Sequence, residues 1–251
     1  PPAWSDVWIC PRASGHIQAI GRDAKGRKQY RYHANWSTHA AESKFDRLPA
    51  FARALPRLHA RVEADLARRG PCREKVLATV VRLLELTLIR IGNARYARQN
   101  RSFGLTTLNK RHLEVDVIRT LREMPGQPVF QYRDTDGDLA TVTSDAVNAY
   151  IREAMGEAFS AKDFRTWAAT LSAARVLREV EPPTSPTDAR RKITACCRTV
   201  SGLLGNTPAV CRSAYIHPKV FARFEAGDLA TALPGPEAKA FEARLLRLLA
   251  E

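Results

Sequence analysis

The sequence predicts an α+β fold, in which a small N-terminal β-sheet domain precedes a mostly α-helical domain. Short β-prone runs occur up to about residue 34, and from about residue 44 apolar residues recur at steps of three and four. Hydrophobic residues make up 45% of the 251 residues, which is enough for a packed core. We place the domains at 1–36 and 37–251, with a linker from about His33 to Lys44.

The N-terminal domain is predicted as a three-stranded sheet. Its strands are Val7 to Ile9, His16 to Ile20 and Gln29 to Tyr32, and the glycines and aspartate of residues 21–27 indicate a hairpin turn between the last two. Three strands make a thin sheet that needs a partner layer. We therefore expect this segment to be part of a larger β domain that is truncated at its N-terminus.

Helices follow in order along the rest of the chain. An apolar face from Phe45 to Leu66 predicts the first one, which we expect Pro49 and Pro56 to break or kink. Val76 to Ile91 is apolar on several sides, which predicts a core helix. The remaining helices are expected over 144–155 with Ser144 as N-cap, after the capping box Ser160-x-x-Asp163, between Thr187 and Gly205, after Thr207-Pro208, and over 237–250.

The chain is strongly basic. It carries 40 Lys+Arg against 26 Asp+Glu, a formal charge of +14, and its pI is about 10.1. Such an excess is typical of proteins that bind an anionic polymer, most often nucleic acid. No apolar run approaches the roughly 20 residues that span a bilayer, and the first residues lack the features of a signal peptide. We therefore expect no membrane partner.

The five cysteines argue against a metal site. They are Cys10, Cys72, Cys196, Cys197 and Cys211, and no two of them have the C-x-x-C spacing of zinc or redox sites. We interpret them as reduced structural thiols of an intracellular protein, and we expect no bound metal.

A basic, aromatic strand is the first candidate for DNA contact. On a strand, Lys28, Tyr30 and Tyr32 point to the same face. Cations beside aromatic rings suit a nucleic-acid groove, because the cations meet phosphates while the polar side chains reach base edges. A solvated amphipathic strand would show the same pattern, so both interpretations stay open.

Three further segments each contain an arginine or tyrosine among apolar residues. Arg90 lies within Leu88 to Asn93, Arg165 lies between Lys162 and Trp167, and Tyr215 closes the segment that begins at Leu204. Burying an arginine such as Arg90 is costly unless it meets an anion. Taken singly, each of these segments is also consistent with a structural role.

Together these motifs resemble one family, the poxvirus-like and bacterial type IB DNA topoisomerases. The resemblance extends in order from Pro2 to about His217. It is carried by the following segments: Lys25 to Tyr32, Ile89-Arg90-Ile91-Gly92-Asn93 with Tyr96, Asn100, Phe103 to Leu108, Lys162 to Trp167, Gly205-Asn206-Thr207-Pro208 and Ser213-Ala214-Tyr215.

The resemblance implies a helical catalytic domain of the topoisomerase IB and tyrosine recombinase type and a reaction that needs no metal, ATP or other cofactor. Tyr215 would attack a phosphodiester of duplex DNA, form a 3′-phosphotyrosyl link and release a 5′-hydroxyl; the cut strand would swivel and be resealed. Arg90, Arg165 and Asn206 would complete the catalytic set. It further implies a monomeric clamp acting in the cytoplasm, associated with the nucleoid, with DNA contacts from Arg27, Lys28, Gln29, Tyr30, Tyr32 and Tyr96.

The residue types fit this chemistry. A phenol, with a pKa of about 10, is a weak nucleophile near neutral pH and must approach an anion. A guanidinium group can bind two non-bridging oxygens of a phosphate at once. Negative charge increases on these oxygens in the transition state, so the contact stabilises it. Two arginines could therefore supply the charge that a metal supplies elsewhere.

Two departures from the family pattern are visible. The family usually has a histidine before Thr-Pro where this chain has Asn206, whose amide can donate a neutral hydrogen bond without titrating. Relatives also carry a lysine general acid on a β-hairpin, yet here Leu113-Glu114-Val115 continues directly into a helix-like stretch from Asp116. Lys110 aligns with a different family position. Either a hairpin that the protein possesses is missing from this sequence between Val115 and Asp116, or the protein itself lacks its proton donor; we favour the first, because the flanking motifs are intact.

Two other classes of protein remain as alternatives. Tyrosine recombinases and integrases share the arginines and tyrosine, but they usually have His-x-x-Arg where this chain has Lys162-x-x-Arg165. A non-catalytic duplex DNA-binding protein would also be basic and could lack the lysine acid.

Overall fold

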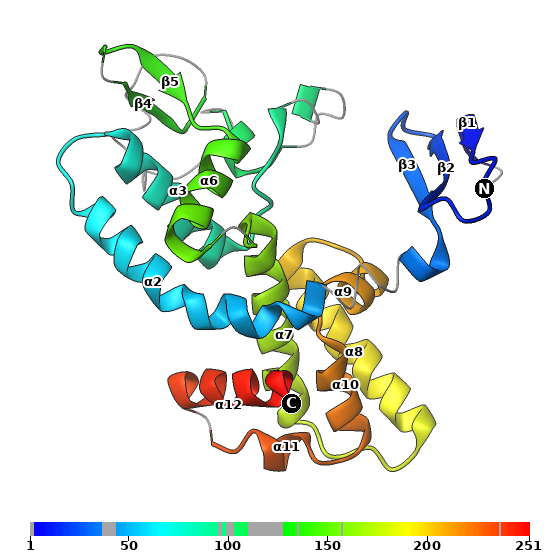
Figure 1. Cartoon of the computed structure of the whole chain (residues 1–251). Coiled ribbons are helices and arrows are strands. Elements are labelled where there is room, and N and C mark those ends of the chain that lie inside the picture. The colour runs from blue at the N-terminus through cyan, green and yellow to red at the C-terminus, as the bar shows by residue number, and fades with distance from the viewer. Residues whose placement is uncertain are drawn as a thin grey trace.

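The computed structural model describes residues 3–36, 44–94, 97–98, 103–109, 128–134, 136–156, 158–235 and 237–251. A small antiparallel sheet forms the N-terminal part, and helices form most of the rest (Figure 1). This is the α+β arrangement that the sequence predicts. The predicted boundary between residues 36 and 37 borders a segment outside the described residues, so it stays a prediction.

The N-terminal sheet has the order β1-β2-β3, with β1 at Ser5–Ile9, β2 at Ile17–Arg22 and β3 at Lys28–Tyr32. The three predicted strands are confirmed. The tight turn between β2 and β3 is closed by Asp23, whose Oδ1 accepts hydrogen bonds from the backbone N–H groups of Lys25 (2.9 Å) and Arg27 (3.0 Å). Gly26 has φ 72°, the left-handed conformation that glycine adopts without steric cost.

The first long helix, α2, differs from its predicted form at Pro56. Helix α2 spans Leu48–Leu66 without a break: Pro49 lies in its first turn, where proline is tolerated, and Pro56 lies inside it. The predicted interruption at Pro49 is present, because the helical residues 44–46 are separated from α2 by a turn at Arg47. A break at Pro56 was wrong, because one face of α2 is buried against α3 (Arg73–Thr87), α6 (Ser144–Met155) and α7 (Ala161–Arg178), and this burial offsets the lost hydrogen bond.

Helix α3 spans Arg73–Thr87 and ends earlier than predicted. Leu88 adopts a left-handed conformation with φ 55°, and its N–H bonds to the Leu84 carbonyl at 3.1 Å. The predicted core helix to Ile91 therefore stops before Arg90, which lies in the segment that follows.

Two of the expected N-caps were wrong by one or two residues. Helix α6 (Ser144–Met155) is capped by Thr143, whose hydroxyl accepts from the Ala146 N–H at 3.1 Å, and not by Ser144. Helix α8 (Pro186–Leu204) is capped by Ser185, not by Thr187, because Pro186 occupies the first helical position. The predicted stop of α8 at Gly205, with φ 58°, is confirmed.

Other predicted helix ends are confirmed. Helix α7 (Ala161–Arg178) begins with the capping box, in which Asp163 Oδ2 accepts from the Ser160 N–H at 2.9 Å. Helix α9 (Pro208–Ala214) is capped by Thr207, and α12 spans Ala238–Ala250.

The sequence did not predict several short elements. They are the 3₁₀ turn η1 (Leu105–Thr107), the hairpin of β4 (Gln131–Arg133) and β5 (Leu139–Thr141), and helices α10 (Pro218–Glu225) and α11 (Leu229–Ala232). Elements this short carry too few residues for a periodic signal.

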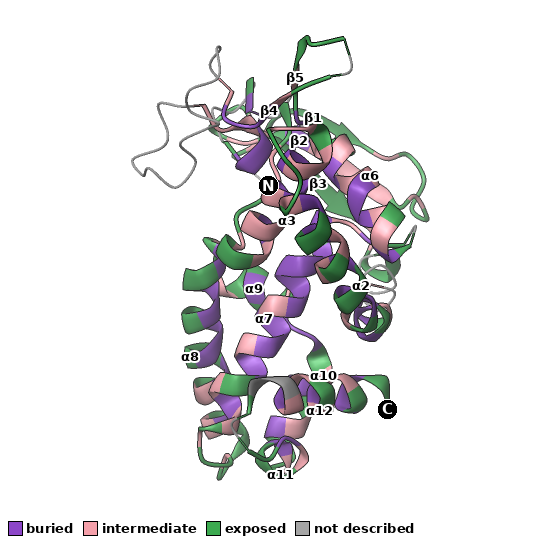
Figure 2. Cartoon of the chain, turned by 90° about the vertical axis from the view of Figure 1, so that its left-hand side faces the viewer, coloured by how far each residue is buried: buried purple, intermediate pink, exposed green. Residues whose placement is uncertain are grey.

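Helix α7 is the central element of the helical domain. It packs against α2, α3, α6, α8, α10, α11 and α12, and twelve of its eighteen residues are buried. Figure 2 shows α7 mostly in the colour of buried residues, whereas α8 beside it has an exposed side. A catalytic group on α7 is therefore held by a rigid scaffold.

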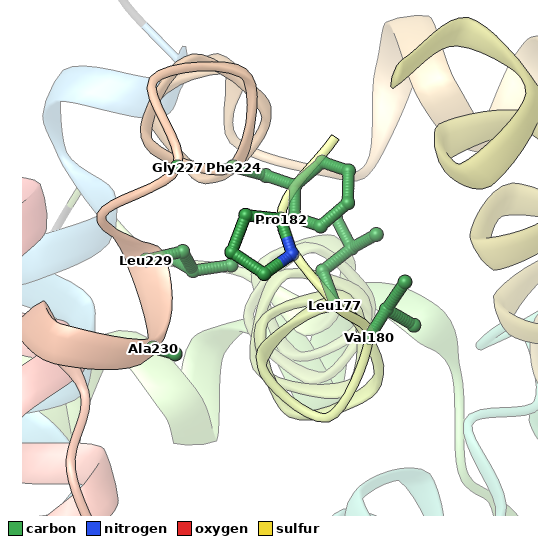
Figure 3. Close-up of a pocket in the computed structure, with 7 residues that line it drawn as sticks. All are labelled: Leu177, Val180, Pro182, Phe224, Gly227, Leu229 and Ala230. Carbon is green, nitrogen blue, oxygen red and sulfur yellow. The ribbon is translucent and has the colours of Figure 1, made fainter. Parts of the chain in front are cut away.

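One small cavity lies between the C-terminal end of α7 and the segment around α10 and α11 (Figure 3). It is lined by Leu177, Val180, Pro182, Phe224, Gly227, Leu229 and Ala230, and its volume is about 10 Å³. An apolar space of that size cannot hold a substrate. Across the described ranges, no helix is both long and apolar enough to span a bilayer.

Candidate active site

Arg90 is positioned by its backbone. Its carbonyl accepts from the Leu105 N–H at 2.8 Å, and the next carbonyl, that of Ile91, accepts from the Thr106 N–H at 2.8 Å and from its hydroxyl at 2.9 Å. The Arg90 side chain is exposed. The expectation that this arginine is buried in an apolar helix was wrong, because α3 ends at Thr87.

Two glycines permit this backbone crossing. Gly92 has φ 90°, and a Cβ at Gly104 would lie 2.4 Å from the Gly92 nitrogen and 2.5 Å from the Arg90 carbonyl oxygen. No side chain fits at these distances. The glycines of the Ile89 to Asn93 and Phe103 to Leu108 motifs therefore bring the two segments into contact and hold Arg90.

Arg165 is the buried arginine of the site, with 4% of its surface exposed. It lies in the first turns of α7 and donates to two helix-terminal carbonyls, Nη1 to Leu88 at the end of α3 and Nη2 to Leu204 at the end of α8 (2.7 Å). Its Nε has no hydrogen-bond partner among the described residues. A buried N–H without a partner is rare and marks a position where a ligand can bind.

The charge environment of Arg165 links it to the other predicted residues. Burial lowers the pKa of its guanidinium, Tyr215 opposes that shift, and Arg90 adds to it by repulsion. The two arginines are thus close enough to interact. An anion bound near both guanidinium groups would offset this repulsion.

Tyr215 lies next to Arg165, with its ring centroid 5.3 Å from the guanidinium carbon. It follows the last residue of α9, and its N–H bonds to the Cys211 carbonyl at 3.0 Å. Thr170 of α7 fixes the backbone beyond it: the Thr170 hydroxyl donates to the Tyr215 carbonyl (3.2 Å) and accepts from the His217 N–H (3.1 Å). The backbone of the segment that carries the phenol is therefore hydrogen-bonded to α7, the helix that also carries Arg165.

Asn206 follows Gly205 at the end of α8, two residues after the carbonyl that Arg165 binds. Both amide atoms of its side chain, Oδ1 and Nδ2, are buried, and neither has a hydrogen-bond partner in the described part of the chain. Burying an unpaired amide is costly. Arg165 and Asn206 therefore each keep an unused donor, and Arg165 lies beside the Tyr215 ring.

A lysine that the sequence analysis did not single out also reaches this site. Lys44 Nζ lies 5.1 Å from the centroid of the Tyr215 ring and donates to the Ala214 carbonyl. In the sequence it stands only at the end of the expected linker, and no spacing or motif marks it. Only the fold brings residues 44 and 215 together.

The predicted DNA-contacting strand has the expected alternation. The rings of Tyr30 and Tyr32 stack with centroids 6.2 Å apart, and each is 46% exposed. Lys28 is also exposed on β3. The exposed Trp8 lies across the sheet from Tyr30, because Ile20 pairs with Tyr30 on one side and with Trp8 on the other.

Arg27 and Gln29 are held by one carboxylate. Asp23 Oδ2 accepts from Arg27 Nε (2.8 Å) and from Gln29 Nε2 (2.9 Å), and its interaction with Arg27 lowers the pKa of the carboxyl to about 2. These two predicted contact residues are thus fixed in position beside the strand, although Asp23 offsets part of the local positive charge.

Several predicted features lie outside the described residues. Tyr96, Asn100, Lys110 and the junction at Val115–Asp116 are among them. The structure does describe the two ends of the segment that contains the junction: Asn109 and Pro128 form an antiparallel bridge, and the Val129 N–H bonds to the Leu108 carbonyl at 3.1 Å.

The five cysteines are free thiols, and burial raises the pKa of Cys196 to about 12 and that of Cys211 to about 11. In the described ranges, no three His, Cys, Asp or Glu side chains are grouped to hold a metal ion. The arrangement around Tyr215 combines a hydroxyl nucleophile with cationic and amide donors, which suits attack on a phosphate ester.

Comparison with known families agrees with this geometry. Residues 33–122 and 115–230 match the family described as eukaryotic DNA topoisomerase I, catalytic core. Residues 1–23 match the bacterial DNA topoisomerase IB, N-terminal domain. The two matches to the catalytic core overlap at residues 115–122, around the junction where the sequence predicts a missing hairpin.

Individual relatives carry related descriptions. The DNA topoisomerase 1B of Acanthamoeba polyphaga mimivirus is 30% identical over 250 residues, covering 86% of this chain and 74% of the relative. The DNA topoisomerase 1B of vaccinia virus (strain Copenhagen) and the DNA topoisomerase I of monkeypox virus are each 26% identical over 99 residues, covering 38% of this chain and 31% of each relative.

Proposed function

The chain belongs to the type IB DNA topoisomerase family, and on that premise we propose that it relaxes supercoiled duplex DNA by reversible transesterification through Tyr215. The observation that carries the proposal is the unused buried Nε of Arg165 beside the Tyr215 ring, together with the unpaired Asn206 amide two residues after the carbonyl that Arg165 binds. These donors are oriented by the fold before any substrate arrives, which is the form that transition-state stabilisation takes in enzymes.

The proposed reaction exchanges one phosphodiester for another. The Tyr215 oxygen bonds to phosphorus, the bond from phosphorus to the 5′-oxygen breaks, and the phenol proton passes to solvent. The released 5′-oxygen takes up a proton and later attacks the phosphotyrosyl link, which restores both the DNA and the tyrosine. Arg90, Arg165 and Asn206 would bind the phosphate oxygens, on which negative charge increases during each step.

The proton donor for the leaving oxygen is the unusual part of this proposal. The alignment with the mimivirus relative spans 250 positions, and 86% of 251 residues is about 216, so roughly 34 aligned positions have no residue in this chain. The doubled match around 115–122 supports placing that gap where relatives carry the lysine hairpin. We infer that this chain lacks the lysine general acid and cleaves slowly.

The strand β3 would contact the duplex. Stacked Tyr30 and Tyr32 beside Lys28, with Arg27 and Gln29 fixed by Asp23, present cations and planar groups on one small sheet. Neutralising phosphates releases counterions, so binding should weaken steeply with salt. The sheet and the helical domain would close around DNA as a clamp. The expectations of a monomer and of a cytoplasmic, nucleoid-associated location stay predictions.

A plasmid relaxation assay without Mg²⁺ or ATP tests the function. The wild-type chain should relax supercoiled plasmid and leave covalent protein–DNA adducts when the reaction is stopped with detergent. Tyr215→Phe should bind duplex DNA as the wild type does and form no adduct, because it lacks the nucleophilic oxygen. Adducts in that variant would refute the assignment of Tyr215. Strand exchange between paired sites would favour a recombinase, and a band shift without relaxation would favour a DNA-binding protein.

A further inference from the structure

Lys44 is tied to the segment that carries the nucleophile. Its Nζ donates to the carbonyl of Ala214, the residue directly before Tyr215, and lies 5.1 Å from the centroid of the tyrosine ring. Lys44 and Ala214 are 170 residues apart in the sequence. The contact therefore joins the start of the helical domain to the end of α9.

The neighbour of Lys44 strengthens the same attachment. The Phe45 ring, 5% exposed, packs against the His217 ring with centroids 5.3 Å apart. On the other side, the Thr170 hydroxyl bonds to the backbone of Tyr215 and His217. The segment 214–217 is thus held between α7 and residues 44–45.

The position is unfavourable for a lysine. Burial lowers the pKa of the Lys44 ammonium to about 8, and repulsion from Lys162 and Arg47 adds to this shift, while Asp163 opposes it. Arg165 lies beside the same tyrosine ring, 5.3 Å from its centroid. A methionine would fill similar space without a buried charge, so the charge itself calls for an explanation.

We propose that Lys44 is a positioning residue for Tyr215, which acts through its positive charge. The ammonium fixes the carbonyl before the tyrosine and places a cation beside the ring, which favours the phenolate that forms when the phenol releases its proton. This inference rests on the proposed transesterification. Lys44, which precedes α2, would act together with Arg90, Arg165 and Asn206, the residues proposed to bind the phosphate.

The first test measures single-turnover cleavage of a duplex at saturating protein. Lys44→Met should cut the cleavage rate by about 10-fold or more, with DNA binding and melting temperature close to wild type. Lys44→Arg, which keeps the charge, should recover most of the rate. Lys75→Met is the matched control. Lys75 lies in the first turn of α3 and also donates to a backbone carbonyl, that of Arg68 (2.6 Å). Lys44→Met with the wild-type rate overturns the proposal.

A pH series separates the charge from a purely structural contact. The ratio of the wild-type rate to the Lys44→Arg rate should fall between about pH 7 and about pH 10, because lysine loses its proton in that range and arginine does not. A constant ratio overturns the role of the charge, and this readout holds even if Lys44→Met fails to fold. If the wild type itself forms no adduct, the proposed function fails, whereas wild-type cleavage with an unaffected Lys44→Met refutes only the role of Lys44.

Discussion

The backbone carbonyl of Arg90 is hydrogen-bonded to the N–H of Leu105 at 2.8 Å, while the Arg90 side chain stays exposed. Arg165 shows the opposite arrangement, because its side chain is buried and donates to the carbonyls at the ends of α3 and α8. The two arginines assigned to one phosphate therefore contribute differently to the fold. Their alanine variants should separate catalysis from stability.

Arg90→Ala should lower the cleavage rate by about 10² without changing the melting temperature. In the proposed reaction the side chain stabilises charge in the transition state, but it is exposed and packs little, so its loss leaves the folded state intact. Single-turnover cleavage and thermal melting measure the two effects. Arg57→Ala, an exposed arginine on α2, serves as the control. A loss of DNA affinity with an unchanged rate would make Arg90 a binding residue instead.

Arg165→Ala should lose both rate and stability. Without the guanidinium, the carbonyls of Leu88 and Leu204 lose their side-chain donor, which costs about 1–3 kcal/mol for each buried group left without a partner. Denaturant unfolding should show the destabilisation, and cleavage measured well below the melting temperature should still be slower by about 10². Equal stability of wild type and variant would contradict the assigned hydrogen bonds.

Asn206→Ala should reduce cleavage by roughly 10², because it removes a preorganised donor to a phosphate oxygen. The fold should tolerate the change, since neither amide atom has a protein partner among the described residues and removing an unpaired buried amide relieves a desolvation cost. Asn206→His restores a donor that titrates, so its rate should gain a dependence on pH near the histidine pKa that the wild type lacks. An unaffected rate in Asn206→Ala would exclude the amide from the site.

A duplex with a 5′-phosphorothiolate at the cleavage position tests the missing general acid. Sulfur leaves without protonation, so a protein without an acid should cleave this duplex faster than the normal one by about 10² to 10⁴. Resealing should remain slow on the unmodified 5′-hydroxyl. Equal rates on the two duplexes would mean that another group donates the proton.

Stability should fall in acid because of His217. Burial lowers the pKa of this imidazole to about 4, with Lys219 adding to the shift and Asp46 opposing it. Between the ordinary pKa of about 6.5 and a pH of about 4, the unfolded chain binds a proton that the folded chain does not, so the free energy of unfolding decreases as pH falls. Over this whole range the loss should be on the order of 3 kcal/mol, at about 1.4 kcal/mol for each pH unit between the two pKa values.

His217→Asn provides the comparison for the acid effect. His217 caps α10 by accepting from the Lys219 N–H at 3.1 Å, and asparagine can make the same cap without titrating. Urea unfolding at about pH 7 and about pH 5 should show a smaller loss for this variant than for the wild type. Parallel losses would assign the acid sensitivity to other groups.

Local patterns in the sequence were sufficient for the elements that depend on neighbouring residues. The strand alternation of Tyr30 and Tyr32, the capping box at Ser160 and the stop at Gly205 are each decided within a few positions along the chain. The motifs around Tyr215, Arg165 and Arg90 could also be recognised in the sequence by their resemblance to one family.

Other features needed the complete fold. Pro56 could remain inside α2 only because distant helices bury the opposite face, and Arg90 left its predicted helix because Leu88 turns into the left-handed region. Each of these outcomes balances a local preference against packing from elsewhere.

The sequence by itself determined which residues are the candidates for the chemistry: a tyrosine, two arginines and an asparagine in family order, on a strongly basic chain. Only the tertiary structure decided how each is used, with Arg165 buried, Arg90 exposed and the Asn206 amide unpaired. It also brought Lys44 to Tyr215. Contacts between residues 170 positions apart leave no periodic trace in a sequence, because they arise only when separate elements pack on a common core.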